Sequence, residues 1–163
     1  MIRIGNGYDV HAFCEGNFII LGGVKIPYER ALQAHSDGDV LIHALCDALL
    51  GSLALGDIGL HFPDNDSSFK SIDSRILLKS VLSLIKSKGY RLSNCDCIVV
   101  AEKPKLQAHI PAMQKIIAND LEVSINAVSV KATTTEKLGF VGRCEGISAY
   151  AVVLIESFEH DSK

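Results

Sequence analysis

Several marks of familiar protein classes are missing from this chain of 163 residues. No apolar run is long enough to span a membrane, and the start lacks the features of a signal or transit peptide, so we expect a cytoplasmic protein. Basic residues are not in excess, because the formal net charge is −3, which gives no case for binding nucleic acid. The sequence also lacks a P-loop, a G-x-S-x-G nucleophile motif and a Cys/His/Asn set.

Cysteine is present, but in an arrangement that favours neither disulfides nor a structural zinc site. The five cysteines are an odd number without a secretory context, so we expect them to be reduced. Cys95 and Cys97 would share one face of a strand, but no second cysteine pair completes a zinc site. We therefore interpret both as packed core thiols.

The length and an apolar content of 48% predict a single domain, residues 1–163, with a substantial hydrophobic core. Segments with the strand period and the helix period alternate, which predicts an α/β (α+β) fold with a small mixed β-sheet and helices packed on one face. The uncovered face of such a sheet would need a partner subunit. Strands are expected at residues 2–4, 8–11, 18–21, 24–26, 95–101, 128–132 and 147–156, with a bend at 5–7, and helices at about 35–56, 74–88 and 111–120.

The stretch from His35 to Gly51, HSDGDVLIHALCDALLG, is the most informative part of the chain. Ser36 followed by Asp39 has the form of an N-terminal capping signal. Apolar residues then recur every three or four positions, which is typical of a buried helical stripe. His43 stands four residues from both Asp39 and Asp47, so the imidazole and the two carboxylates can share one face.

A possible metal site combines His43 with the segment Asp9-Val10-His11. On an extended strand Asp9 and His11 point to the same side. Together the three side chains would offer a metal one oxygen and two nitrogens and leave a fourth position open for substrate, which is the ligand count of a catalytic zinc site. In the alternative interpretation, His43 is a hydrogen-bonded interior histidine and Asp9 caps a turn.

A second polar group follows the strand expected at residues 128–132. Hydroxyls and backbone N–H groups of residues 133–136, TTTE, can hold phosphate oxygens, and the Glu136 carboxylate can hold a Mg²⁺ that bridges phosphates. The alternative is a run of β-branched residues that ends in an ordinary turn. Together with the possible zinc site, this group suggests phosphoryl chemistry on a small substrate.

Two loops have less specific patterns. Lys103 and Lys105 lie in a proline-broken loop after a strand, where ligands often bind, or they are simply solvated. The acidic loop at residues 57–66 is either a solvated connection or a lid over a site.

Long sequence strings make the interpretation specific. They are DVH at Asp9–His11, AHSDGDVLIHALCDALLG, LGDIG at Leu55–Gly59, FPDND at Phe62–Asp66, HIPAM and VKATTTEKLGFVGR. In the same order and over nearly the whole chain, these strings closely resemble the 2-C-methyl-D-erythritol 2,4-cyclodiphosphate synthase family. The resemblance implies a homotrimer with active sites between subunits. It also implies an enzyme of the non-mevalonate route to isoprenoids that converts 4-diphosphocytidyl-2-C-methyl-D-erythritol 2-phosphate to the cyclic diphosphate and CMP.

The resemblance also implies roles for individual residues. Asp9, His11 and His43 match the Zn²⁺ ligands, Glu136 matches the ligand of Mg²⁺ or Mn²⁺, and His35 and Thr134 match positions that stabilise the transition state. Substrate-binding positions at the methylerythritol phosphate and metal end are Asp9, Val10, His11, His35, Ser36, Asp57, Ile58, Gly59, Phe62, Pro63, Asp64, Asn65 and Asp66. Those for the nucleotide and phosphates are Ala101, Glu102, Lys103, Pro104, Lys105, Leu106, Gln107, Thr133, Thr134, Thr135, Glu136, Phe140 and Arg143.

Two other functions remain possible from the sequence. A zinc-dependent hydrolase of a cytidine diphosphate ester would use water in place of the internal phosphate and would give an open bisphosphate. A non-catalytic sensor of isoprenoid phosphates would keep the fold without turnover, but the presence of His35, Asp57, Thr134 and Glu136 beside the zinc set argues against it.

Overall fold

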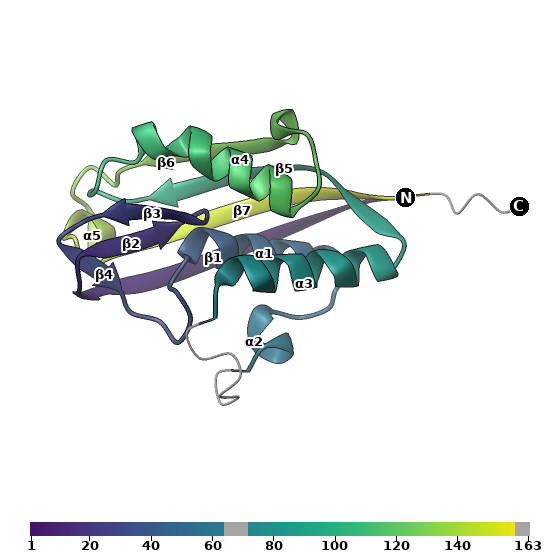
Figure 1. The fold of residues 1–163 in the computed structure, drawn as a ribbon, viewed down its shortest axis with the longest axis horizontal. Coiled ribbons are helices and arrows are strands. Elements are labelled where there is room, and N and C mark those ends of the chain that lie inside the picture. The colour runs from purple at the N-terminus through teal and green to yellow at the C-terminus, as the bar shows by residue number, and fades with distance from the viewer. Residues whose placement is uncertain (64–71, 159–163) are drawn as a thin grey trace, which may run out of the picture.

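One five-stranded sheet organises the chain in the computed structural model, which describes residues 1–63 and 72–158 (Figure 1). The strand order is β4-β1-β7-β5-β6, and each neighbouring pair is antiparallel except β5 and β6, which are parallel. The mixed sheet predicted from the sequence is therefore confirmed. The strand bounds are β1 Ile2–Glu15, β4 Arg30–Leu32, β5 Tyr90–Val100, β6 Val128–Thr133 and β7 Gly146–Ser157.

The three longer helices and a separate hairpin lie together on one face of this sheet (Figure 1). The helices are α1 Val40–Ser52, α3 Ser74–Ser87 and α4 Ile110–Asp120, and the hairpin strands are β2 Phe18–Leu21 and β3 Val24–Pro27. The shorter elements are α2 Ile58–His61, α5 Gly139–Gly142 and 3₁₀ turns at Gln107–His109 and Ile125–Ala127. Within the described ranges, no helix is long and apolar enough to cross a membrane.

The other face of the sheet carries apolar side chains that no described helix covers. Side chains two residues apart on a strand point to the same face, so this surface follows the even-numbered positions of β1 and β7. A contiguous apolar surface of this kind is typical of an interface. Its most exposed large members, between 42% and 68% exposed, are Ile2, Ile4, Tyr8, Val10, Tyr150 and Val152.

The predicted bend at residues 5–7 is wrong, because β1 runs through it without interruption. The two glycines instead allow helix and strand backbones to touch. A Cβ atom added to Gly5 would lie 1.9 Å from the Ala48 carbonyl oxygen, and one added to Gly7 would lie 1.9 Å from the Ala44 carbonyl oxygen. Only glycine permits α1 to pack this closely on β1.

Helix α1 begins later than its capping signal predicts. Its N-cap is Asp39, whose side chain accepts a hydrogen bond from the Ile42 N–H, and Ser36 lies in the preceding loop. The predicted stripe is confirmed, since Leu41, Leu45, Ala48 and Leu49 are fully buried, but eleven of the thirteen residues of α1 are buried in total. The helix is therefore a central core element rather than a one-sided surface helix.

Most of the other longer elements follow the predicted periods, whereas β4, α2 and α5 were not predicted. The apolar stripe of α3 is buried as expected, whereas β5 begins at Tyr90, five residues before the expected strand. Cys95 and Cys97 are buried and free, as predicted, because they face the helices from β5.

Candidate active site

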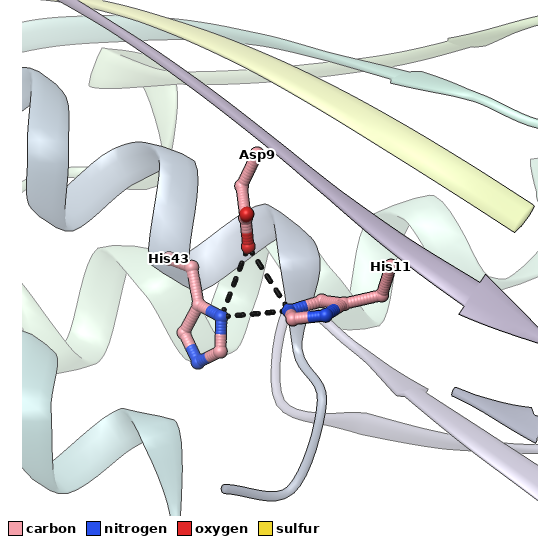
Figure 2. Close-up of side chains that lie close together, drawn as sticks. All are labelled: Asp9, His11 and His43. Atoms are coloured by element: carbon pink, nitrogen blue, oxygen red, sulfur yellow. Dashed lines mark hydrogen bonds and ion pairs between the residues drawn. The ribbon is translucent and has the colours of Figure 1, made fainter. Parts of the chain in front are cut away.

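Three side chains converge where β1 passes under the N-terminal half of α1 (Figure 2). The Asp9 Oδ2 atom lies 3.0 Å from His11 Nε2 and 3.0 Å from His43 Nδ1, and the two nitrogens are 3.1 Å apart. Asp9 and His11 are two residues apart on β1 and therefore point to the same side of the sheet, and their contacts with His43 show that this is the side that α1 covers. In the part of the chain that the structure describes, this is the one group of three potential ligands close enough to share a metal ion.

The donor set fits a divalent cation better than it fits a hydrogen-bonded cluster. Three atoms that can each offer a lone pair face one another. Hydrogen bonds can form at only some of the three contacts, whereas one cation can be bound by all three atoms at once. A tetrahedral zinc ion places its ligand atoms roughly 3.3 Å apart, close to the observed spacing. The side chains of Asp9 and His11 are 25% and 17% exposed and that of His43 is 7% exposed, so the open coordination position would face solvent.

The charges of this cluster favour a cation. Burial opposes ionisation of Asp9, but hydrogen bonds from His11 and His43 outweigh it and hold the Asp9 pKa well below its usual range. Burial also opposes the charged form of His43, but Asp9 outweighs it and raises the His43 pKa. The site therefore contributes a full carboxylate charge that is available to a metal ion at neutral pH.

The carboxylates expected beside His43 lie elsewhere. Asp39 is fully buried and accepts hydrogen bonds from the backbone N–H groups of Gly22 and Gly23, at 2.9 and 2.7 Å, so it ties the β2–β3 turn to α1. Burial raises the pKa of Asp39 to about 6. Asp47 accepts from the Ile58 N–H at 2.8 Å and thereby holds the start of α2. Asp9, from the neighbouring strand, is the carboxylate that contacts His43.

The outer ring nitrogen of His43 has partners that sequence patterns did not indicate. His43 Nε2 lies 2.9 Å from the hydroxyl of Ser74, at the start of α3, and 3.0 Å from the hydroxyl of Ser36. The Ser74 hydroxyl in turn donates to the Asp37 carboxylate. Asp37 lies within the string HSDGDV, but Ser74 belongs to none of the quoted strings, and its only signal is its place, as a polar residue, at the buried end of an amphipathic helix.

The TTTE segment forms a turn at the end of β6. Thr134 and Glu136 do not lie on an extended strand, because β6 ends at Thr133 and Glu136 has a φ of 53°. The turn nevertheless brings the two side chains together, with the Thr134 hydroxyl 3.4 Å from Glu136 Oε1. Glu102 stabilises this turn by accepting from the backbone N–H groups of Thr135 and Lys137, at 3.0 and 3.1 Å.

The other positions expected to contact nucleotide and phosphates surround this turn. Residues 101–107 connect β5 to α4, and in them Lys103 and Lys105 are exposed while Ala101 and Leu106 are buried. Phe140 lies in α5, directly after the turn. The guanidinium of Arg143 is paired with Glu145 by two hydrogen bonds, at 2.8 and 3.1 Å, so a phosphate there would have to share it.

The positions expected to bind the methylerythritol phosphate lie on the α1 side of the molecule. His35 is exposed in the loop before α1, and Asp57 caps α2 by accepting from the Leu60 N–H at 3.0 Å. Ile58 and Gly59 lie in α2, and Phe62 and Pro63 follow it. The positions Asp64, Asn65 and Asp66 fall outside the described residues.

The group of Asp9, His11 and His43, called the metal cluster below, lies far from the TTTE turn within one chain. The strand register aligns Val10 with Ser148, Ser148 with Val100 and Val100 with Thr133. Three strand spacings therefore separate the Asp9–His11 pair from the end of β6, which is roughly 14 Å. The structure brings the residues of each half together but not the two halves.

Comparisons with known proteins agree over nearly the whole chain. A family model described as the YgbB family matches residues 2–156. The chain is 61% identical over 157 residues to the 2-C-methyl-D-erythritol 2,4-cyclodiphosphate synthase of Thioalkalivibrio sulfidiphilus, covering 96% of this chain and 98% of that protein. It is 60% identical over 154 residues to the synthase of Azotobacter vinelandii, covering 94% of this chain and 98% of that protein.

Solved structures have the same fold. The bifunctional IspDF of Campylobacter jejuni matches with a TM-score of 0.94 and 46% identity, over 98% of this chain and 43% of that longer chain. A CDP complex of IspF from Plasmodium falciparum matches with a TM-score of 0.85 and 37% identity, over 97% of both chains.

Proposed function

The chain belongs to the YgbB family and is a cyclodiphosphate synthase of the non-mevalonate route to isoprenoids, and we propose that its site residues act across subunit boundaries. We propose that residues 1–163 form one domain that converts 4-diphosphocytidyl-2-C-methyl-D-erythritol 2-phosphate to 2-C-methyl-D-erythritol 2,4-cyclodiphosphate and CMP. The observation that carries the assignment of the reacting centre is the convergence of Asp9, His11 and His43 to 3.0–3.1 Å. The five free cysteines support a cytoplasmic location.

The residues present fit two metal sites. Asp9, His11 and His43 would hold Zn²⁺ with one position open, and Glu136 would hold Mg²⁺ or Mn²⁺ through the substrate phosphates. When bound, these ions supply Lewis-acid polarisation and neutralise phosphate charge. The attacking 2-phosphate is already an anion, so the protein needs no strong general base.

The other residues position an all-anionic substrate. The carboxylate of Asp57 would repel a phosphate, so we assign it, with the neighbouring residues of α2, to the hydroxyl groups of the methylerythritol part. His35 and the Thr134 hydroxyl can donate hydrogen bonds to phosphate oxygens as charge shifts between them. The main contribution of the site is thus alignment of the 2-phosphate with the β-phosphorus, which replaces an encounter in solution.

A homotrimer would bring the two halves of the site together. Ions that contact one diphosphate lie on the order of 4 Å apart, whereas roughly 14 Å separates the two halves within one chain. The apolar sheet face at Tyr8, Val10, Tyr150 and Val152 is exposed in the single chain and is the surface that packing of subunits would bury. A ring of three subunits would place the metal cluster of each subunit beside the TTTE turn of the next, and it would also bury the apolar sheet face.

Product analysis tests this function. The purified protein is incubated with the proposed substrate and both metals, and ³¹P NMR follows the organic product. A cyclic diphosphate together with CMP is the expected result. An open bisphosphate would instead indicate the zinc-dependent hydrolase, and binding without turnover would indicate the sensor.

A further inference from the structure

We propose that Ser74 and Asp37 form a hydrogen-bonded chain that holds the His43 ring in the tautomer able to bind the metal ion. This inference rests on the proposed metal site and deepens it. Ser74 and Asp37 do not face the metal side of the ring. They act through His43 and are positioning residues.

The contacts run in one line from the carboxylate to the ring. Asp37 accepts from the Ser74 hydroxyl through Oδ1 and from the Ser74 backbone N–H through Oδ2, at 3.0 Å for the latter. The Asp39 N–H also donates to Asp37 Oδ1, at 3.1 Å. The Ser74 hydroxyl lies 2.9 Å from His43 Nε2, and Ser74 is completely buried. The chain therefore links the loop before α1, the first turn of α3 and the metal cluster.

The direction of each hydrogen bond follows from the end of the chain. An ionised carboxylate can only accept, so the single proton of the Ser74 hydroxyl points to Asp37. The same hydroxyl can then only accept from His43, which places the ring proton on Nε2. With the Nε2 proton held in this way, the proton that the ring releases is the one that Nδ1 shares with Asp9, and Nδ1 then offers its lone pair to a metal ion. A second-sphere partner that selects the tautomer of a histidine ligand in this way typically affects metal affinity by about 10–100-fold.

Ser36 lies at a similar distance but cannot select the tautomer. Its hydroxyl is 3.0 Å from His43 Nε2, and its other hydrogen bond in the described structure is a long one, accepted from the Gly38 N–H at 3.4 Å. Among the described residues, no carboxylate determines where the Ser36 proton points, so this hydroxyl can donate to Nε2 or accept from it. Ser36 is also a predicted substrate contact, and it can turn toward substrate because Ser74 keeps the ring in place.

Metal affinity of matched serine variants tests the proposal. Zn²⁺ affinity is measured by competition with a chromophoric chelator, and Co²⁺ replaces Zn²⁺ so that its visible d–d absorption reports ligand geometry. We expect Ser74→Ala to lower the affinity about 10–100-fold and to change the Co²⁺ spectrum, and Ser74→Thr, which keeps the hydroxyl, to restore most of the loss. Ser36→Ala is the matched control, and its metal affinity should stay within about threefold of the wild type.

The outcomes separate the possible failures. Wild-type protein that binds no metal would overturn the proposed metal site itself. Wild-type protein that binds metal, together with Ser74→Ala at equal affinity or Ser36→Ala with the same loss, would overturn the role of Ser74 alone. If Ser74→Ala does not fold, ¹⁵N-histidine NMR of Zn²⁺-loaded wild-type protein decides. His43 should carry a proton on Nε2 that exchanges slowly with solvent, and a rapidly exchanging or missing Nε2 proton would contradict the proposal.

Discussion

Replacing Gly7 by alanine tests how strictly the contact of α1 with β1 sets the metal cluster. The added Cβ would lie 1.9 Å from the Ala44 carbonyl oxygen and 2.7 Å from the Ala48 nitrogen. Both neighbours are backbone atoms of α1, so no side chain can turn away. An ordinary van der Waals contact begins at 3.4 Å, so the helix would have to move by about 1.5 Å.

Both stability and metal binding should suffer from this movement. Overpacking of a core costs about 1–3 kcal/mol, and we expect the upper end here because backbone meets backbone. For a chain of this size, about 3 kcal/mol lowers the melting temperature by roughly 6–12 °C. Asp9 follows Gly7 on β1 and His43 precedes Ala44 on α1, while metal–ligand distances tolerate only about 0.2 Å. The affinity for Zn²⁺ should therefore fall at least about tenfold.

The assay compares this variant with Gly51→Ala in the same helix. A Cβ at Gly51 would have the Asn6 carbonyl oxygen as its nearest neighbour, at 3.8 Å, and alanine favours a helix by about 1 kcal/mol. Gly51→Ala should therefore melt at or above the wild-type temperature and bind zinc normally. Melting is followed by circular dichroism on metal-free protein at one concentration, because assembly shifts the midpoint. A Gly7→Ala protein that melts within about 2 °C of the wild type and binds zinc equally well would refute the reasoning.

Four further substitutions test the site and the core. His43→Ala should stay folded but lose its bound metal, about one Zn²⁺ per chain, and its activity, and normal zinc content would make His43 an interior histidine. Thr134→Val should lower kcat about 10–100-fold with little change in KM. Glu136→Gln should raise the Mg²⁺ concentration needed for half-maximal rate and leave the zinc content unchanged. Wild-type kinetics in both variants would mean that the TTTE turn has only a structural role. Burial opposes ionisation of Asp120, but Arg75 and Lys79 outweigh it and lower its pKa, so Asp120→Asn should cost about 2–3 kcal/mol above pH 4. In urea unfolding this difference should shrink as the pH falls through the folded-state pKa of Asp120, and a constant difference would contradict the ion-pair account.

Local sequence patterns predicted most of the longer elements of the fold, because burial repeats with the period of each element. The stripe of α3 and the hairpin around Gly22 and Gly23 depend on such near neighbours, and the structure confirms both. The pair Asp9 and His11 was predicted to share a face for the same reason, and that geometry is independent of the tertiary fold. The convergence of His43 on this pair was a hypothesis from ligand chemistry, which the structure supports.

Features that depend on a distant partner were not predictable in this way. Spacing places Asp39 and His43 on one helix, but whether the carboxylate turns to His43 or to the Gly22 and Gly23 N–H groups depends on where the hairpin packs. Gly5 and Gly7 led to the wrong prediction of a bend. The real reason for these glycines is their close contact with α1, which is a tertiary property and leaves no local pattern. The partnership of Ser74 with His43 joins residues 31 positions apart and left no local signal.

Subunit complementation tests the shared site directly. His43→Ala keeps its TTTE turn and Glu136→Ala keeps its metal cluster, so in the proposed homotrimer each variant alone should be inactive. The two variants are co-expressed with different tags, and trimers that carry both tags are purified. In any ring of three that contains both variants, one interface joins an intact cluster to an intact turn, so these trimers should recover about one third of the wild-type rate. If both halves of the site belonged to one chain, no mixture would recover activity. A monomeric mass by light scattering at low micromolar concentration would likewise exclude the shared site, because the roughly 14 Å between Val10 and Thr133 would then separate the two metal positions in the working enzyme.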